Sequence, residues 1–340
     1  MSLILLACAS LLVSVAGVAA FIGWAARGGL IDVPNLRSSH QVPTPRGAGA
    51  VIVLVVTAVA GYGAYRAGFD QVVIAVPALL IAGISGADDI RSLPSWLRLL
   101  VHTGCAVVVV LAVRQAVPGG WPLAAMILST VWIVGLTNAY NFMDGIDGIS
   151  GAQAVVSGLA LTVAAMHAGL LEVAAAGIAI AAASAGFLVH NWSPARVFMG
   201  DVGSAFLGFS FAAGALQVGS VSRAAGVMVG LSLWPFVFDT ALTLVRRAVR
   251  RENIFAPHRS HLYQRLVIAG WSHPAVATLY MGWAVLVSVA SGLWAVEGWS
   301  NWMLGAVPLI SALIWAIVLM QEATVRRTRR TRDGATTLQR

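Results

Sequence analysis

The chain has 340 residues, of which 59% are hydrophobic and 10% are charged, and its mean hydropathy is +0.85. Soluble domains carry roughly 45–50% apolar and about 25% charged residues, so this composition excludes a water-soluble globule. It predicts instead an all-α, polytopic membrane protein. The net charge of +8 comes from 21 arginines between apolar stretches, a pattern that follows membrane topology and argues against a nucleic-acid partner.

Apolar segments of transmembrane length follow one another along the chain. A hydrocarbon core about 30 Å thick needs a helix of about 20 apolar residues. The first segment lacks the basic start and the cleavage site of a signal peptide, so we expect it to be retained. The length rule predicts about 11 transmembrane helices, in order over residues 3–26, 47–66, 71–87, 99–117, 121–137, 152–169, 172–190, 205–219, 224–245, 274–296 and 302–321. They form one predicted integral-membrane catalytic domain over residues 1–321, followed over 322–340 by a basic cytoplasmic tail that we expect to be disordered.

The arginines divide unequally between the two sides of the predicted bundle. The odd-numbered connections and the tail hold 18 of the 21, and positively charged loops face the cytoplasm. The N-terminus is therefore predicted to be periplasmic and the C-terminus cytoplasmic, in a bacterial inner membrane. Most of the sparse acids fall on the same side, so we expect the active site to face the cytoplasm.

The first cytoplasmic loop, over residues 32–47, is the first candidate site. Pro43 and Pro45 stiffen it, which favours a positioned anion site, although basic loops more often only report topology. Its cations are Arg37, His40 and Arg46.

Asp88 and Asp89 end the third predicted span. Adjacent carboxylates repel each other, and anions at the C-terminus of a helix oppose the helix dipole, so plain capping explains them poorly. A nearby cation would relieve both effects, and ionisable groups at the membrane edge are typical of functional sites.

The connection between the fifth and sixth spans, residues 138–148, carries acids and no basic residue. Two Asp-Gly pairs, at Asp144 and Asp147, can point both carboxylates the same way. A tight turn followed by a helix N-cap explains the pattern equally well.

A glycine-rich segment, residues 198–204, opens the eighth span around Asp201. Glycines allow close approach of the backbone, and the N-terminus of a helix attracts phosphate. Asp201 is either the N-cap or a ligand of Mg²⁺, which commonly binds one or two carboxylates together with substrate phosphates.

The connection after the ninth span holds His258, Arg259 and His261, and the span itself holds Asp239. Asp239 either lines a groove for a lipid phosphate or pairs with an arginine. Cytoplasmic acids, cations and glycine-lined helix starts together suggest Mg²⁺-dependent phosphoryl transfer.

In this order the motifs resemble those of the polyprenyl-phosphate N-acetylhexosamine-1-phosphate transferase family, over roughly residues 32–266. The resemblance implies a phosphoglycosyltransferase that takes a UDP-N-acetylhexosamine and undecaprenyl phosphate and gives undecaprenyl-diphospho-sugar and UMP. It also implies Mg²⁺, with Mn²⁺ as a substitute, a lipid environment and the option of a homodimer.

The resemblance assigns roles to individual residues. The implied catalytic residues are Asp88, Asp89, Asp144, Asp147 and His261. The implied nucleotide- or phosphate-binding residues are Arg37, His40, Thr44, Arg46, Asn141, Phe198, His258 and Arg259, and the implied metal ligands are Asp144 and Asp201.

One departure from the family pattern concerns the biological product. The family's His-x-His-His signature is reduced to His261 followed by Tyr263 and Gln264. This favours the initiation of an O-antigen or capsule polysaccharide over a phospho-N-acetylmuramoyl-pentapeptide transferase, which stays an alternative. A transporter or flippase is the alternative from another class, although transporters place ionisable groups near the midplane.

Overall fold

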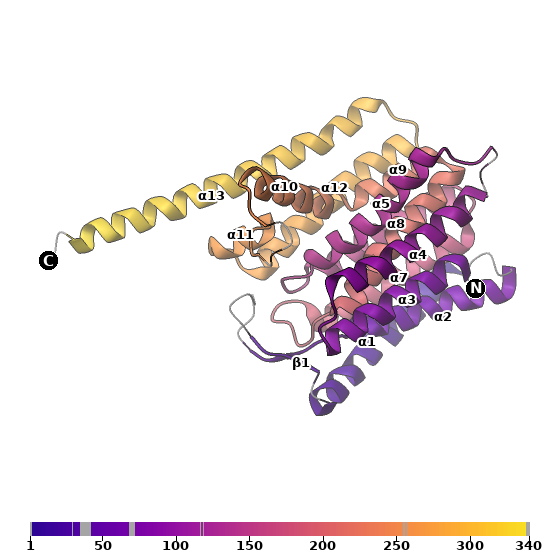
Figure 1. Cartoon of the computed structure of the whole chain (residues 1–340), viewed down its shortest axis with the longest axis horizontal. Coiled ribbons are helices and arrows are strands. Elements are labelled where there is room, and N and C mark those ends of the chain that lie inside the picture. Colours follow the sequence, from indigo (N-terminus) through magenta and orange to yellow (C-terminus); the bar gives the residue numbers. More distant parts are fainter. Residues whose placement is uncertain are drawn as a thin grey trace.

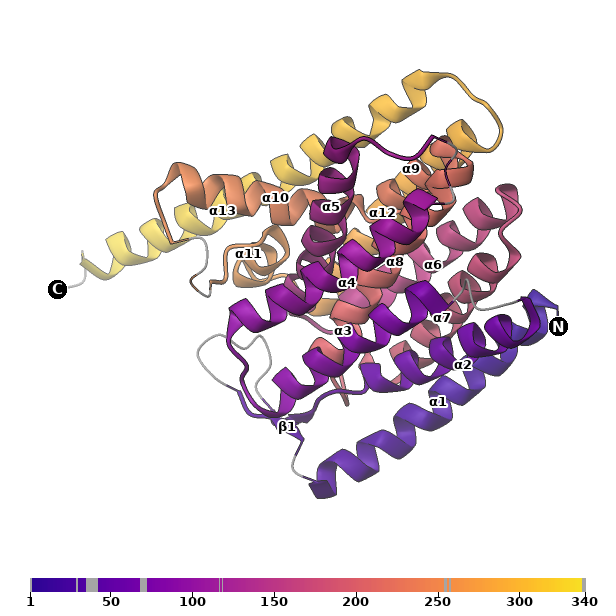
Figure 2. The same cartoon turned by 45° about the vertical axis from the view of Figure 1, so that its right-hand side comes forward.

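The structure is a computed structural model that describes residues 2–28, 30–34, 42–67, 72–115, 117, 119–253, 256 and 258–337. Its elements are α1 (Leu3–Gly28), β1 (Ile31–Asp32), β2 (Thr44–Pro45), α2 (Gly49–Ala67), α3 (Val72–Ile90), α4 (Ser95–Gln115), α5 (Leu123–Phe142), α6 (Ile149–His167), α7 (Leu171–Asn191), α8 (Asp201–Val221), α9 (Arg223–Ser232), α10 (Trp234–Val249), α11 (Leu262–Ile268), α12 (His273–Ala295), the 3-10 helix η2 (Asn301–Gly305) and α13 (Ala306–Thr337). This confirms the all-α prediction. Helices α1 and α2 lie along one edge of the bundle, and α10 to α13 lie along the opposite edge (Figure 1, Figure 2).

The predicted spans coincide with observed helices. Within the described residues, eight helices are long and apolar enough to cross a membrane, namely α1, α3 to α8 and α12. The pair α9 and α10 adds a ninth if it forms one span, and shorter apolar helices cover Gly49–Gly63 and Ala306–Gln321. The multi-pass membrane architecture is therefore confirmed, while the number of crossings and the direction of the termini stay predictions.

The ninth span is not the single straight helix expected over 224–245. It bends by 66° between α9 and α10. Pro235 lies in the first turn of α10, where its missing N–H and its ring prevent α9 from continuing. Helix α10 therefore runs in a different direction from α9.

Helix α10 buries its polar side chains and exposes its apolar ones. Its buried face carries Asp239, Thr243 and Arg247, which are spaced four residues apart and so share one side of the helix. Its exposed face is apolar, with Val245 60% and Val249 78% exposed. The polar face of α10 therefore faces protein, and the apolar face suits lipid.

The C-terminal tail differs from its prediction. Helix α13 continues to Thr337, so helix occupies most of residues 322–340, where we expected disorder. Residues 322–333 contain no glycine or proline and include arginine, alanine and glutamate, which are good helix formers. The end of α13 extends beyond the rest of the bundle in both overall views (Figure 1, Figure 2).

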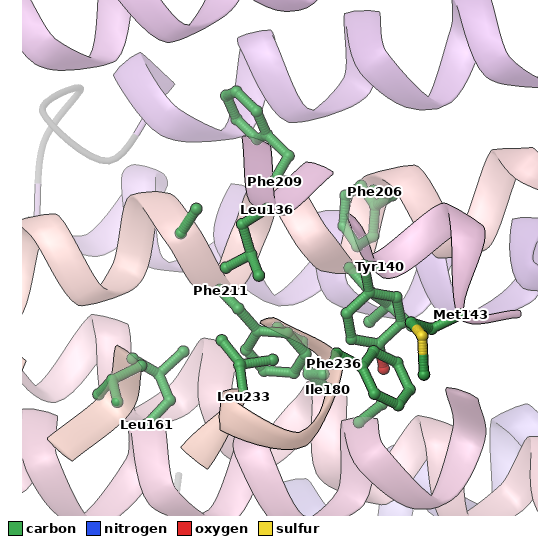
Figure 3. Close-up of a cluster of buried hydrophobic side chains, with 14 of the residues drawn as sticks. Leu136, Tyr140, Met143, Leu161, Ile180, Phe206, Phe209, Phe211, Leu233 and Phe236 are labelled. Carbon is green, nitrogen blue, oxygen red and sulfur yellow. The ribbon is translucent and has the colours of Figure 1, made fainter. Parts of the chain in front are cut away.

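The core lies around α6, α7 and α8, whose apolar segments are 78%, 61% and 72% buried, against 22% for α1. Aromatic and aliphatic side chains from α5, α6, α8 and the α9–α10 turn meet there (Figure 3). The ring of Tyr140 packs edge-on against Phe236 at a centroid distance of 5.0 Å, and its hydroxyl donates to the carbonyl of Ser150 over 2.7 Å. This packing holds the end of α5 and thereby the acidic turn that follows it.

A short sheet joins the first loop to the same end of the bundle. Strands β1 and β2 pair antiparallel, and the backbone N–H of Phe198 donates to the carbonyl of Pro45 over 2.8 Å. The backbone N–H of Gly47 donates in return to the carbonyl of Phe198 over 3.0 Å. The first loop and the start of α8, distant in sequence, therefore lie side by side.

Candidate active site

Asp88, Arg98 and Asp201 form an ion-pair bridge between α3, α4 and α8. Nη1 of Arg98 lies 2.6 Å from Oδ2 of Asp88 and 3.3 Å from Oδ2 of Asp201. The other carboxylate oxygen of Asp88 accepts the backbone N–H of Leu93 over 2.6 Å. Both oxygens of Asp88 are thus engaged, whereas Asp201 is one-third exposed and has room for a further partner.

Asp89 supplies a helix cap from a different helix. Its two carboxylate oxygens accept the backbone N–H groups of Asp201, over 3.1 Å, and Val202, over 3.0 Å. These amides belong to the first turn of α8, which has no intrahelical partner for them. The N-cap residue itself is Gly200, so the N-cap alternative for Asp201 is wrong, and its role as a metal ligand stays a prediction.

Gly200 makes this arrangement possible. Its φ is +74°, and a Cβ there would lie 2.8 Å from Oδ2 of Asp89 and 2.9 Å from Cα of Gly47. Any other residue would be strained and would collide with the cap. The glycines in this motif therefore serve close packing between α8, α3 and the first loop.

The first loop contributes Arg46 to this cluster. Its guanidinium donates to the backbone carbonyl of Asp89, and Nη2 lies 3.8 Å from Oδ1 of Asp89. Thr44, by contrast, is buried, and its hydroxyl donates to the carbonyl of Val42 over 2.9 Å. Arg46 thus joins the first loop to Asp89, and its predicted contact with a phosphate stays a prediction. Thr44 shapes the loop, while Arg37 and His40 lie outside the described residues.

Asn141 and Asp144 face the start of α8 from the turn after α5. The side-chain amide of Asn141 donates to the hydroxyl of Ser204 over 3.1 Å. Burial raises the pKa of Asp144 to about 7, and the negative charges of Asp201 and Asp89 add to this, with the Ser150 side chain partly offsetting them. Asp144 therefore lies close enough to Asp201 and Asp89 to feel their charge.

The donor set fits a divalent cation held jointly with a substrate. In the described part of the chain, no group of three or more His, Cys, Asp or Glu side chains is arranged to hold a metal ion. Mg²⁺ needs only one or two carboxylates when phosphates supply further oxygens, and Asp144 and Asp201 offer two. Burial is the main cause of the raised pKa of Asp144 and the charges of Asp201 and Asp89 add to it, and a cation bound between Asp144 and Asp201 would favour their charged forms.

Asp147 points to a different set of partners. Its oxygens lie 3.3 Å from Nδ1 of His273 and 3.2 Å from the backbone N–H of Ala195. Burial alone would raise the pKa of Asp147, but the hydrogen bonds and charge of His273, with further donors from Ser193 and Ala195, hold it below its usual range. Asp147 fastens the start of α12 to the segment before α8, and a direct part in catalysis stays a prediction.

Asp239 is the acceptor for five donors in the interior. Its oxygens accept the backbone N–H groups of Leu262 and Tyr263, the hydroxyls of Thr243 and Tyr280, and Nδ1 of His261. It is fully buried and caps α11, so it neither lines a groove nor pairs with an arginine, as the two sequence-based alternatives had it.

The loop before α11 is held by its backbone as well. The guanidinium of Arg247 donates to the carbonyls of Asn253 and Ala256, and the hydroxyl of Thr243 lies 3.5 Å from the carbonyl of Ser260. The rings of His258 and His261 lie 5.0 Å apart. Burial, then the nearby His261 and Arg247, lower the pKa of His258 to about 4, which favours its neutral form, and its predicted contact with a nucleotide or phosphate stays a prediction.

Sequence reasoning missed Arg98 and the purpose of Asp239. Arg98 was counted only as a topological charge, although it lies in the same cytoplasmic connection as the Asp88-Asp89 pair. Asp239 stood out as an acid inside a span, which was a valid signal of importance, but no sequence pattern connects it to Tyr280 or to the start of α11.

Comparison with known proteins agrees with these motifs. Residues 71–219, which include Asp88 through Asp201, match the sequence profile described as Glycosyl transferase family 4. A probable undecaprenyl-phosphate N-acetylglucosaminyl 1-phosphate transferase of Bacillus subtilis is 31% identical over 268 residues, 74% of each chain. A decaprenyl-phosphate N-acetylglucosaminephosphotransferase of Mycolicibacterium smegmatis is 28% identical over 351 residues, 88% of this chain and 85% of the relative.

Another relative, whose name gives a different transferred group, matches over a shorter part of the chain. The phospho-N-acetylmuramoyl-pentapeptide-transferase of Latilactobacillus sakei is 28% identical over 196 residues, 57% of this chain and 58% of the relative. On the matched profile and the extent of the Bacillus subtilis relationship, this chain belongs to glycosyl transferase family 4, the polyprenyl-phosphate hexosamine-1-phosphate transferases that its motifs resemble.

Proposed function

We propose that this chain transfers an N-acetylhexosamine 1-phosphate from a UDP-sugar to undecaprenyl phosphate, giving undecaprenyl-diphospho-sugar and UMP. The observation that carries the proposal is the acidic cluster at the N-terminus of α8, where Arg98 pairs with Asp88 and Asp201 and the charge of Asp201 acts on Asp144. A helix N-terminus, an arginine and incompletely neutralised carboxylates suit a metal-bound diphosphate. The relatives' names support the two substrates.

In the proposed reaction, an oxygen of the lipid phosphate attacks the sugar-bearing phosphorus in line and displaces UMP. A phosphate monoester has a second pKa of about 6, so the lipid phosphate is mostly dianionic at pH 7 and needs little help from a base. Asp88 already has both oxygens engaged by Arg98 and Leu93. We therefore assign Asp88 to holding Arg98 in place rather than to removing a proton.

The remaining residues bind and orient the donor in this proposal. Asp201 and Asp144 would hold Mg²⁺ or Mn²⁺, which supplies charge neutralisation at the diphosphate. Arg46 and Asn141 flank the same space, and Phe198, beside Arg46 in the backbone pairing, would stack on uracil. His261, His258 and Arg259, with Arg37 and His40, are proposed contacts of the phosphates and the sugar.

We assign the reaction to the cytoplasmic face of a bacterial inner membrane, where the arginine distribution places these motifs. Tyr263 and Gln264 in place of the family's histidines favour initiation of an O-antigen or capsule polysaccharide. The loss of these two histidines also argues against the second candidate, transfer of phospho-N-acetylmuramoyl-pentapeptide. The name of the Latilactobacillus sakei relative supports that second candidate. Association into a homodimer is part of the proposal and is tested by mass in detergent.

The test offers membranes containing the protein a panel of radiolabelled UDP-sugars, including UDP-N-acetylmuramoyl-pentapeptide, with undecaprenyl phosphate and Mg²⁺. Label is expected in the lipid phase with an N-acetylhexosamine donor and is expected to disappear with Asp201→Asn or with EDTA. Folded protein that moves no label with any donor would refute the proposal. Transfer of the pentapeptide donor alone would establish the second candidate instead.

A further inference from the structure

Tyr263 connects the interior of α11 to the turn that carries Asp144. Its hydroxyl donates to the backbone carbonyl of Phe142 over 3.1 Å, although the two residues are 121 positions apart. The side chain is 1% exposed. Phe142 ends α5 and precedes Asp144 by two residues, so this hydrogen bond reaches the base of the acidic turn.

Gly145 is shaped to receive this hydroxyl. A Cβ at Gly145 would lie 2.1 Å from Oη of Tyr263 and 3.0 Å from Cζ. The same hydroxyl that donates to Phe142 therefore also lies against the backbone of Gly145, the residue after Asp144. Tyr263 thus contacts the turn at one residue before Asp144 and at one residue after it.

Tyr263 is itself held from the opposite side. Its backbone N–H donates to Oδ2 of Asp239 over 3.2 Å, and its ring stacks on His261 at a centroid distance of 5.8 Å. Burial raises the pKa of Tyr263, and the charges of Asp239 and Asp144 add to this, so the hydroxyl keeps its proton and remains a donor. A continuous set of contacts thus runs from α10 through α11 to the acidic turn.

We propose that Tyr263 is a positioning residue, which fixes the Asp144 turn within the acidic cluster through its hydrogen bond to Phe142 and its contact with Gly145. The proposal rests on the proposed function for its kinetic consequence only. The hydrogen bond is a property of the fold, so its effect on the turn is measurable in protein without substrate. This position holds tyrosine where the resembling family pattern has histidine, so the contact distinguishes this chain within that pattern.

The experiment compares Tyr263→Phe with Tyr280→Phe. The second variant also removes a buried hydroxyl that donates a hydrogen bond, in its case to the carboxylate of Asp239 over 2.7 Å. Amide hydrogen exchange is followed by mass spectrometry in full-length protein in nanodiscs. Tyr263→Phe is expected to speed exchange across residues 142–146 by roughly three- to tenfold, the scale of one lost hydrogen bond. Tyr280→Phe is expected to leave exchange in that turn unchanged.

Kinetics provide the second measurement. Tyr263→Phe is expected to raise the KM for the nucleotide sugar by roughly three- to tenfold and to lower kcat, while the KM for undecaprenyl phosphate stays constant. A merely structural role would lower the amount of active enzyme without changing any KM. Unchanged exchange in Tyr263→Phe, or equal changes in both tyrosine variants, would overturn the proposal.

Gly145→Ala tests the same contact from the other side and covers the case in which Tyr263→Phe does not fold. The added methyl group must displace the Tyr263 hydroxyl, so exchange in the turn is expected to rise. In the double variant with Tyr263→Phe the two effects should be less than additive, because one contact is being removed twice. Full additivity contradicts the proposal, whereas wild-type protein that transfers no sugar contradicts only the proposed function.

Discussion

Two groups of buried acids in this molecule are organised in opposite ways. Around α8, the carboxylates of Asp88, Asp89, Asp144 and Asp201 outnumber the guanidinium groups of Arg46 and Arg98 that pair with them in the described structure. Around α11, the single carboxylate of Asp239 accepts from five donors. The first group has charge left over for a ligand, and the second has none.

The number of partners that a carboxylate has indicates whether it stabilises the fold or is available to bind a ligand. A carboxylate with every lone pair used contributes to stability and cannot take a new partner without losing an old one. Carboxylates that remain under-neutralised cost stability and are kept where a cation or a phosphate-bound metal completes them. Asp89 falls between the two cases, since it caps α8 while its charge still acts on Asp144.

The largest expected effect comes from removing the carboxylate of Asp239, whose two oxygens accept five hydrogen bonds. Asp239→Ala leaves five buried donors without an acceptor and should lower the free energy of unfolding by at least about 3 kcal/mol. Asp239→Asn keeps one acceptor oxygen and should lose less. Unfolding followed in detergent measures both, and a loss below about 1 kcal/mol for Asp239→Ala would show that the two groups do not differ as described.

Asp201→Asn should have the reverse profile. Loss of the charge is expected to lower kcat by about 10²–10³-fold, the scale of one preorganised electrostatic contact. The unfolding free energy should change by less than about 1 kcal/mol, because the partner Arg98 is one-third exposed and retains Asp88. Transfer assays and unfolding curves on one preparation check this, and parallel losses in both would contradict the separation.

Asp144 gives the under-neutralised group a pH signature. Its pKa of about 7 in the folded protein lies above the usual value of about 4, so the folded state binds more protons between those values. The unfolding free energy should therefore fall as pH rises from 4 to 7, by at most about 1.4 kcal/mol per pH unit from this group. Asp144→Asn should flatten that slope, and Asp32→Asn, on β1, should leave it in place. A slope identical in wild type and Asp144→Asn would rule out a raised pKa at Asp144 in the folded protein.

The smallest expected effect concerns the shared cap. Asp89→Ala removes the acceptors of the first-turn amides of α8 and should cost about 1 kcal/mol of stability. Hydrogen exchange should rise at residues 201–203. Ser222→Ala is the matched control, since Ser222 caps α9 and its loss should affect residues 223–225 only. Unchanged exchange at residue 202 in Asp89→Ala would show that Asp89 does not cap α8, and would leave it with the under-neutralised acids alone.

The sequence predicted which acids gather and on which helix ends, because span length and motif order place Asp88, Asp144 and Asp201 at ends of spans on one side. It could not predict what each acid does there. Asp89 and Asp147 stand in the same motifs as Asp88 and Asp144, and the sequence does not distinguish them. In the structure, Asp89 caps α8 and Asp147 pairs with His273. Such partners are chosen by tertiary packing, which no spacing records.

The bend at α9–α10 shows a similar limit. Pro235 is a valid signal of a break, but Pro77 lies inside α3 without ending it. Whether a proline interrupts a span depends on neighbouring groups that satisfy the freed backbone. The helical course of α13 past residue 321 was missed for the opposite reason, since its charge suggested disorder while its residues favour helix.

Helix α10 buries its polar side chains and exposes its apolar ones, which affects what can surround the loop it holds. The helix that holds the loop carrying His258 and His261 rests its other face, through Leu244, Val245 and Val249, on whatever surrounds the protein. A soluble enzyme would cover such a helix with a second layer of protein. In a multi-pass membrane protein such an exposed apolar face suits contact with lipid in place of a second layer of protein.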